Sequence, residues 1–189
     1  VEENVIDRNG LIRNESGDFW GHTHNRNLYL NAPYIYVKDN IITDSASEGV
    51  QLRYDFKPVE GRPVRKEIIN NFFARNRVKG FYIHGQANDD KNSYVKANDN
   101  VIMDGQDISY KSMRGMAGSF TEVSNGELMN NIVAHNTRST GNLRGFELVT
   151  NVTNVKIINN TQYKWRAPGL YLYYDGLRGI SYEGNNVAE

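Results

Sequence analysis

The stretch Ile68-Ile69-Asn70-Asn71-Phe72-Phe73 is the clearest copy of a short motif that returns along the whole chain. Each copy has an Asn as its anchor, and six of the seven copies have an apolar residue three positions earlier. The anchors lie at Asn9, Asn40, Asn71, Asn100, Asn131, Asn160 and Asn186, in steps of 31, 31, 29, 31, 29 and 26 residues. An amide that recurs at this period predicts a solenoid in which each repeat forms one coil.

A second apolar stretch follows each of the first six anchors. These stretches read Phe19-Trp20-Gly21-His22, Val50-Gln51-Leu52-Arg53, Phe81-Tyr82-Ile83-His84, Tyr110-Lys111-Ser112-Met113, Phe146-Glu147-Leu148-Val149 and Leu170-Tyr171-Leu172-Tyr173. Short apolar runs broken by Asn and Gly favour strands over helices. Because side chains alternate along a strand, the core would receive Val50, Leu52, Phe81, Ile83, Phe146, Leu148, Leu170 and Leu172.

The opposite face of the same strands would carry two outer rows. The first row is Trp20, Gln51, Tyr82, Lys111, Glu147 and Tyr171, and the row beside it is His22, Arg53, His84, Met113, Val149 and Tyr173. Stacked parallel strands lie ~4.8 Å apart, so equivalent residues of successive coils form ladders along the axis. The Asn anchors would pass their amide hydrogen bonds from coil to coil in the same way.

These patterns predict an all-β fold, a right-handed parallel β-helix of about seven coils, each 26–31 residues long, with an Asn ladder. A leucine-rich repeat also uses an Asn ladder, but its repeats are about 20–29 residues long with L-x-x-L-x-L spacing. The period here is longer and that spacing is absent, so the β-helix is favoured. Residues 1–189 fit one domain.

The composition narrows the range of functions. The 22 basic and 22 acidic residues cancel, so nucleic acid is not an expected partner. No apolar run approaches the ~18 residues of a membrane span, so membrane insertion is not expected. Zero cysteines exclude disulfides and thiolate metal sites. Solenoids normally carry polar caps, and none is visible in this sequence, so we expect a segment of a longer polypeptide or a processed form.

The coils resemble the pectate-lyase-like, right-handed parallel β-helix superfamily. The resemblance is carried by Ile68-Ile69-Asn70-Asn71-Phe72-Phe73 with Gly80-Phe81-Tyr82-Ile83, and by Ile157-Ile158-Asn159-Asn160 with Gly169-Leu170-Tyr171-Leu172. That superfamily includes polysaccharide lyases, glycoside hydrolases, epimerases, and the tailspikes and appendages of bacteriophages. The aromatic and Asn-rich coils look most like a segment of a phage tailspike or appendage. The Asp-Pro-His motif of alginate epimerases and the calcium-site carboxylates of pectate lyases are not matched.

The outer rows supply the predicted binding surface. Tyr and Trp rings stack on the C–H faces of sugars, and the amide and charged groups between them bond hydroxyls or carboxylates. An exposed row of this apolar content marks an interaction surface. The predicted substrate-binding residues are Trp20, His22, Gln51, Tyr82, Tyr171, Tyr173, Asp55 and Asp175. Packing of edge loops or of a second chain over the same row is the alternative.

The predicted catalytic residues are Glu147, His84, Arg53 and Lys111. A lyase acting on a uronic acid needs a cation that neutralises the carboxylate, here Arg53 or Lys111. It also needs a base that removes the adjacent proton, for which the sequence offers His84, Tyr82 or a lysine of lowered pKa. Binding of an acidic sugar without catalysis is the alternative role for His84 and Arg53.

A glycoside hydrolase needs two carboxylates, ~5–5.5 Å apart for retention or ~6.5–9.5 Å for inversion. Glu147 is the best single candidate, because an acid on an otherwise apolar strand is not needed for folding. Asp55 and Asp175 end equivalent strands but lie several coils apart, too far to act together. A solvated carboxylate is the alternative for all three.

No metal and no cofactor is predicted. His22-Thr23-His24 would point both imidazoles to one side of a strand, but no third ligand is recognisable and no H-E-x-x-H motif is present.

Three functions remain open at this stage. The first is a phage tailspike or appendage that binds, and as a lyase or hydrolase degrades, a bacterial surface polysaccharide, assembled as a homotrimer in the virion. The second is a free, secreted, extracellular polysaccharide lyase or glycoside hydrolase. The third is a structural shaft without activity.

Overall fold

The structure is a computed structural model, and it describes residues 1–8, 12–13, 19–20, 26–53, 63–85, 94–104, 116–134, 144–163, 169–173 and 176–188. Within these ranges the chain forms strands and turns without a helix, and so no helix that is long and apolar enough to cross a membrane. Three large sheets, A, B and D, run the length of the molecule, and every pairing between named strands within them is parallel. The all-β parallel β-helix predicted from the sequence is confirmed.

Each complete pass of the chain contributes a strand to A, then to B, then to D. Sheet A contains β5 (Tyr34–Lys38), β8 (Arg65–Ile69), β11 (Tyr94–Asn98), β14 (Gly126–Met129), β17 (Val155–Ile158) and β20 (Ser181–Glu183). Sheet B contains β1 (Val5–Asp7), β6 (Ile41–Thr43), β9 (Phe72–Ala74), β12 (Val101–Met103), β15 (Ile132–Ala134), β18 (Thr161–Tyr163) and β21 (Asn186–Ala188). Sheet D contains β4 (Leu28–Asn31), β7 (Glu48–Arg53), β10 (Lys79–His84), β13 (Met116–Thr121), β16 (Arg144–Leu148) and β19 (Leu170–Leu172).

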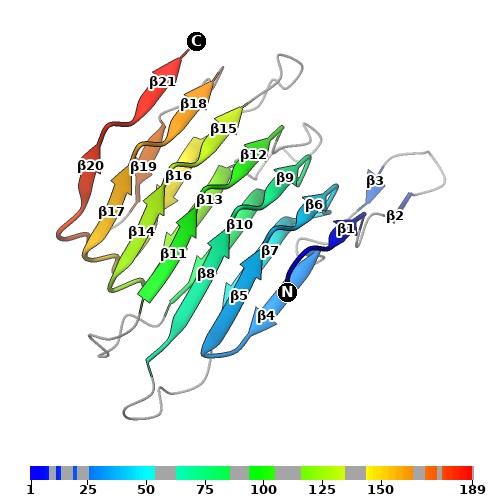
Figure 1. Ribbon diagram of the computed structural model, residues 1–189, viewed down its shortest axis with the longest axis horizontal. Helices are drawn as coiled ribbons and strands as arrows, with labels where there is room; N and C mark the ends of the chain where they lie inside the picture. The colour runs from blue at the N-terminus through cyan, green and yellow to red at the C-terminus, as the bar shows by residue number, and fades with distance from the viewer. Residues whose placement is uncertain are drawn as a thin grey trace.

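Successive strands of each sheet lie side by side, so the colour in Figure 1 runs evenly from the N-terminal to the C-terminal end of the stack. The small sheet C, an antiparallel pair of β2 (Ile12–Arg13) and β3 (Phe19–Trp20), stands apart from the other three. The number of complete coils is smaller than the seven expected, because the first and last passes do not place strands in all three sheets.

The corner between sheets A and B is the same in every coil. It consists of two residues, such as Asn70 and Asn71 between the end of β8 and the start of β9. The first residue of each corner has a positive φ: Glu3, Asp39, Asn70, Asp99, Asn130, Asn159 and Gly184, with φ between 53° and 60°. Asn, Asp and Gly tolerate this left-handed conformation better than other residues, which explains the Asp or Asn that usually precedes an anchor.

The second residue of the corner forms the Asn ladder. Asn71 Nδ2 donates to Asn100 Oδ1 at 3.1 Å, and the backbone N–H of Asn71 donates to the same oxygen at 3.0 Å. The ladder runs through Asn4, Asn40, Asn71, Asn100, Asn131, Asn160 and Asn185. Five of the predicted anchors, from Asn40 to Asn160, are therefore right, Asn186 is wrong, and Asn9 lies outside the described residues.

The ends of the ladder differ from the prediction. Its first described member is Asn4, because the next residue, Val5, pairs with Ile41 of the following coil. Asn185, not Asn186, is the last, because Asn186 already belongs to β21 and pairs with Thr161. In both places the sequence offers two Asn residues near the expected spacing, and only the strand pairing selects between them.

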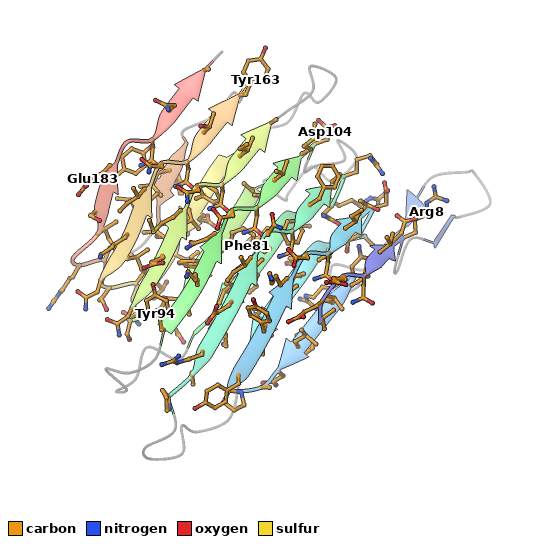
Figure 2. All side chains as sticks on the ribbon, in the orientation of Figure 1. Arg8, Phe81, Tyr94, Asp104, Tyr163 and Glu183 are labelled. Carbon is orange, nitrogen blue, oxygen red and sulfur yellow. The ribbon has the colours of Figure 1, made fainter. Side chains whose placement is uncertain are left out.

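The core lies between the three sheets. Phe81 is fully buried, with its ring centroid 6.1 Å from that of Phe73 and 6.3 Å from that of Phe146, and Figure 2 shows it in the interior. Gly118 lies opposite Phe81 in the next coil, where a Cβ would come within 2.2 Å of the Phe81 ring. A residue without a side chain is therefore needed at position 118.

The predicted inner residues of the second strands are nearly all buried. Val50, Leu52, Phe81, Ile83, Phe146 and Leu148 are at most 1% exposed, as predicted. Leu170 is half-buried, and Leu172 is 54% exposed because β19 is the edge strand of sheet D.

Candidate functional site

The outer face of sheet D carries the candidate site. Its central row consists of residues that pair in register across six strands: Tyr29, Gln51, Tyr82, Ser119, Glu147 and Tyr171. Beside it, toward the strand ends, Asn31 pairs with Arg53 and His84 pairs with Thr121. The buried residues that alternate with this row, such as Leu52 and Ile83, face the core.

A third outer position lies at the start of these strands. A Cβ at Gly80 would meet Ile102 of the core, and the next residue, Phe81, is itself in the core. Because these two consecutive residues face inward, the residues on either side of them, Lys79 and Tyr82, both face outward. Glu48 occupies the position of Lys79 one coil earlier.

Lys79 is the centre of a polar cluster on this face. Its Nζ donates to Ser119 Oγ at 3.1 Å, lies 3.7 Å from Glu147 Oε2, and stands 4.5 Å from the centroid of the Tyr82 ring. Burial lowers the pKa of Lys79 below its ordinary value, although the negative charges of Glu147 and Glu48 oppose this change. A lysine in this position is easier to deprotonate than one on an open surface.

His84 belongs to a neighbouring group. Its Nε2 lies 3.3 Å from Glu122 Oε2, and its ring centroid is 6.2 Å from that of Tyr82. The backbone carbonyl of His84 accepts a hydrogen bond from Nζ of Lys66, a fully buried lysine of β8. Burial raises the pKa of Tyr82, while a hydrogen bond with Thr121 and the charge of Arg53 act in the opposite direction.

The central row is not the open aromatic stripe that the sequence suggests. Gln51 and Ser119 are 1% exposed and Glu147 is 6% exposed, although all three face away from the core. Aromatic residues occupy its ends. Tyr29 is 48% exposed and lies under the guanidinium of Arg26. At the other end the rings of Tyr171 and Tyr173 have centroids 5.6 Å apart. The face therefore combines a buried polar centre with partly exposed tyrosines at both ends.

Several predicted site residues come together here. Glu147 and Tyr82 both contact Lys79, and Tyr171 pairs with Glu147 in the register of the sheet. Arg53 and His84 are the next residues after the paired Leu52 and Ile83, so they lie on adjacent strands, as predicted.

Other predicted residues lie elsewhere. Trp20 was expected in the central row, but it pairs with Ile12 in sheet C, and Tyr29 takes its place. The position expected for His22 is held by Asn31, opposite Arg53.

The fourth coil is shifted in the same way. The position expected for Lys111 is held by Ser119, opposite Tyr82, and Thr121 rather than Met113 lies opposite His84. The cause is the connection from sheet B to sheet D, which has four residues between Ala74 and Lys79 but twelve between Met103 and Met116. His22, Asp55, Lys111 and Asp175 themselves lie outside the described residues.

Sequence reasoning missed Lys79, Ser119 and Glu48. A signal for two of them exists in the repeated order of a charged residue, Gly and an apolar residue: Glu48-Gly49-Val50, Lys79-Gly80-Phe81 and Arg144-Gly145-Phe146. The repeated Gly marks the point where two residues in succession face inward. Ser119 carries no comparable signal.

Two further findings bear on the site. Over the described ranges, no three His, Asp or Glu side chains group together as metal ligands. The chain matches no protein-family model, and neither a curated protein nor a solved structure matches it.

Proposed function

We propose that the outer face of sheet D binds a bacterial surface polysaccharide, in a protein of the phage tailspike or appendage kind within the pectate-lyase-like superfamily. The observation that carries this proposal is the central row, in which six side chains of hydrogen-bonding or aromatic type stand in register on successive coils. Coils repeat every ~4.8 Å, so an extended sugar chain along the axis would meet the exposed Tyr29 and the half-buried Tyr82 and Tyr171 along one line, while Gln51, Ser119 and Glu147 between them are buried.

The buried polar centre supports a binding role. Placing an amide, a hydroxyl and a carboxylate out of water costs free energy unless they are paired. Gln51, Ser119 and Glu147 are buried on the face opposite the core, where contacts with Lys79 hold Ser119 and Glu147 in fixed positions. Binding sites typically hold a few such fixed polar groups beside aromatic surface.

The charges favour a glycan over other polymers. Arg53, Lys79 and His84 are interspersed with Glu48, Glu122 and Glu147, so neither sign dominates the face. A nucleic acid would require a continuous basic surface. A mixed face suits hydroxyl groups with an occasional carboxylate.

Binding to a panel of capsular polysaccharides and lipopolysaccharides, measured by calorimetry, tests the proposal. Tyr82→Ala should weaken binding about tenfold, in line with the loss of an aromatic contact. Tyr36→Ala is the matched control, because Tyr36 is exposed on sheet A, and it should bind like the wild type. Equal loss in both variants, or no binding to any glycan, would leave the structural shaft as the better hypothesis.

The products and the assembled mass test the remaining parts of the proposal. New unsaturated ends that absorb in the ultraviolet would indicate a lyase, and new reducing ends without that absorbance a hydrolase. A stable homotrimer in solution would favour the virion part, and a monomer that cleaves glycan would favour the free extracellular enzyme.

A further inference from the structure

Lys79 and Ser119 are placed as a base and a nucleophile are placed in a catalytic pair. Ser119 Oγ is 3.1 Å from Lys79 Nζ, within the range of about 2.6–3.2 Å over which a base activates a hydroxyl. The two residues come from adjacent strands, β10 and β13, whose pairing is fixed by the sheet. Side chains on strands hold such a geometry more firmly than side chains on loops.

A third group orients the lysine. Glu147 lies on the strand after that of Ser119, and its Oε2 is 3.7 Å from Lys79 Nζ. Tyr82 lies on the same strand as Lys79, and its ring centroid is 4.5 Å from Nζ. Ser–Lys pairs are a known variant of the serine nucleophile with its base, and here Glu147 holds Nζ in place while its charge opposes the loss of the lysine proton. Burial lowers the pKa of Lys79, so the lysine reaches more readily the neutral form that a base requires.

We propose that Ser119, with Lys79 as its base, hydrolyses small O-acyl esters, acetyl above all, on the polysaccharide bound at sheet D. The proposal rests on the proposed function for its substrate. Ester cleavage suits this group of residues because it needs one nucleophile and one proton-transferring base. Ser119 is almost fully buried, so the acyl group must be small and the side chains over Oγ must shift to admit it.

The reaction balances with water as the only co-reactant. Lys79 takes the proton of Ser119 Oγ, and the new Oγ–C bond forms at the acyl carbonyl. The tetrahedral intermediate collapses, the C–O bond to the sugar breaks, and the sugar oxygen leaves with the proton from Lys79. Water then attacks the acyl-serine and gives its proton to Lys79. When the acyl carbon leaves Ser119 as the carboxylic acid, Oγ recovers that proton.

The test measures acetate released from an O-acetylated polysaccharide that the chain binds, with p-nitrophenyl acetate as a small second probe. Ser119→Ala should lower both rates about 100-fold, the usual contribution of a nucleophile activated by a base. Lys79→Arg should do the same, because arginine keeps the positive charge beside Glu147 but cannot accept a proton. Circular dichroism would establish that both variants are folded.

Lys96→Met is the matched control. Lys96 forms the corresponding lysine–glutamate pair on sheet A, 3.9 Å from Glu127, so its loss should leave the rate of acetate release within about twofold of wild type. A fluorophosphonate probe should add one mass increment, mapped to Ser119. Equal rates in wild type and Ser119→Ala would overturn the proposal.

Glycan binding, measured separately, distinguishes the two proposals. Wild-type chain that binds polysaccharide but releases no acetate would sink the esterase and keep the binding function. Ester hydrolysis that depends on Ser119, without binding to any polysaccharide, would support the Ser119–Lys79 pair as a catalyst and sink the glycan as its substrate.

Discussion

Two lysine–glutamate pairs lie on different sheets, with similar distances between their charged atoms but different surroundings. On sheet D, Lys79 and Glu147 are 3.7 Å apart, with side chains 13% and 7% exposed. On sheet A, Lys96 and Glu127 are 3.9 Å apart, with side chains 33% and 25% exposed. The same two residue types are thus a solvated pair on one sheet and a largely desolvated pair on the other.

The pair on sheet A belongs to a row of alternating charge. Glu67, Lys96, Glu127 and Lys156 pair in register on four successive strands, so each charge has opposite charges on its neighbours. Burial alone would raise the pKa of Glu127, but hydrogen bonds with Tyr94 and Asn98 and the charges of Lys96 and Lys156 lower it below the ordinary value. Such a row is worth a few tenths of a kcal/mol per pair and needs no ligand to explain it.

The pair on sheet D has no such simple account. Removing both charges from water is costly, and the attraction between them offsets that cost only when the geometry is good. Its neighbours, Ser119 and Tyr82, supply a hydroxyl group and an aromatic ring and not a further opposite charge. Exposure and neighbouring groups, not the residue pair itself, therefore separate a stabilising contact from a candidate site.

The largest predicted loss of stability tests whether the difference between the two lysine–glutamate pairs is local. Asn100→Ala removes an acceptor from the Asn71 backbone N–H and a donor to the Ile68 carbonyl, both buried. Unsatisfied buried groups of this kind should lower the free energy of unfolding by about 3 kcal/mol, measured by urea denaturation. The Asn ladder lies at the corner between sheets A and B, and neither lysine–glutamate pair includes a ladder residue, so each pair should keep its own contribution in this background.

Asn186→Ala is the control for that experiment. Asn186 lies in the exposed strand β21 outside the ladder, so its replacement should change stability by less than about 0.5 kcal/mol. A larger loss for Asn186→Ala than for Asn100→Ala would contradict the assigned ladder.

A smaller effect should separate the pairs directly. Glu147→Gln leaves Lys79 without its carboxylate in a desolvated position, which should lower the free energy of unfolding by about 2 kcal/mol at neutral pH. Glu127→Gln removes a partly solvated charge and should lower it by less than about 1 kcal/mol. Equal losses in the two variants, compared by urea denaturation, would show that burial does not distinguish the two pairs.

The smallest effect is a difference in pH dependence. The pKa of Lys79 is below 10.5 in the folded chain, so between that lowered pKa and 10.5 the unfolded chain holds a proton that the folded chain has lost. Stability, relative to Lys79→Met, should therefore rise with pH in this window, by at most about 1.4 kcal/mol per pH unit.

Glu127 should give a second pH dependence of stability, in the acid range. Its pKa is lowered below 4.5 in the folded chain, so its contribution is present above 4.5 and is lost as the pH falls through the folded pKa. Thermal unfolding of Lys79→Met and Glu127→Gln, each compared with wild type over a range of pH, would measure both pH dependences. A rise in stability at alkaline pH that persists unchanged in Lys79→Met would show that another group causes it.

The fold was predictable because its strongest signal is local. The corner of two residues between sheets A and B repeats without change, so five ladder positions, from Asn40 to Asn160, could be read from spacing alone. The inner residues around Phe81 and Ile83 followed from alternation. Both patterns are set by the backbone within a few residues of the anchor.

The candidate site was only partly predictable because it depends on the connections from sheet B to sheet D, which vary in length. Gln51, Tyr82 and Glu147 lie where a short or correctly guessed connection places them in the central row. Ser119 and Tyr29 displace Lys111 and Trp20 because spacing cannot reveal how many residues a connection holds before the strand resumes. The outward direction of Lys79 arises from the pair Gly80 and Phe81 facing inward together, a departure from alternation that a periodic pattern does not include.

The constant corner has a consequence for how such a protein can change. Since two residues fix every turn from A to B, extra residues inserted before sheet D or after it leave the height of each coil unaltered. Segments at those positions can therefore be exchanged between proteins of this architecture without moving Lys79 relative to Ser119. Variation in the length of the connections is thus separated from the spacing of the coils.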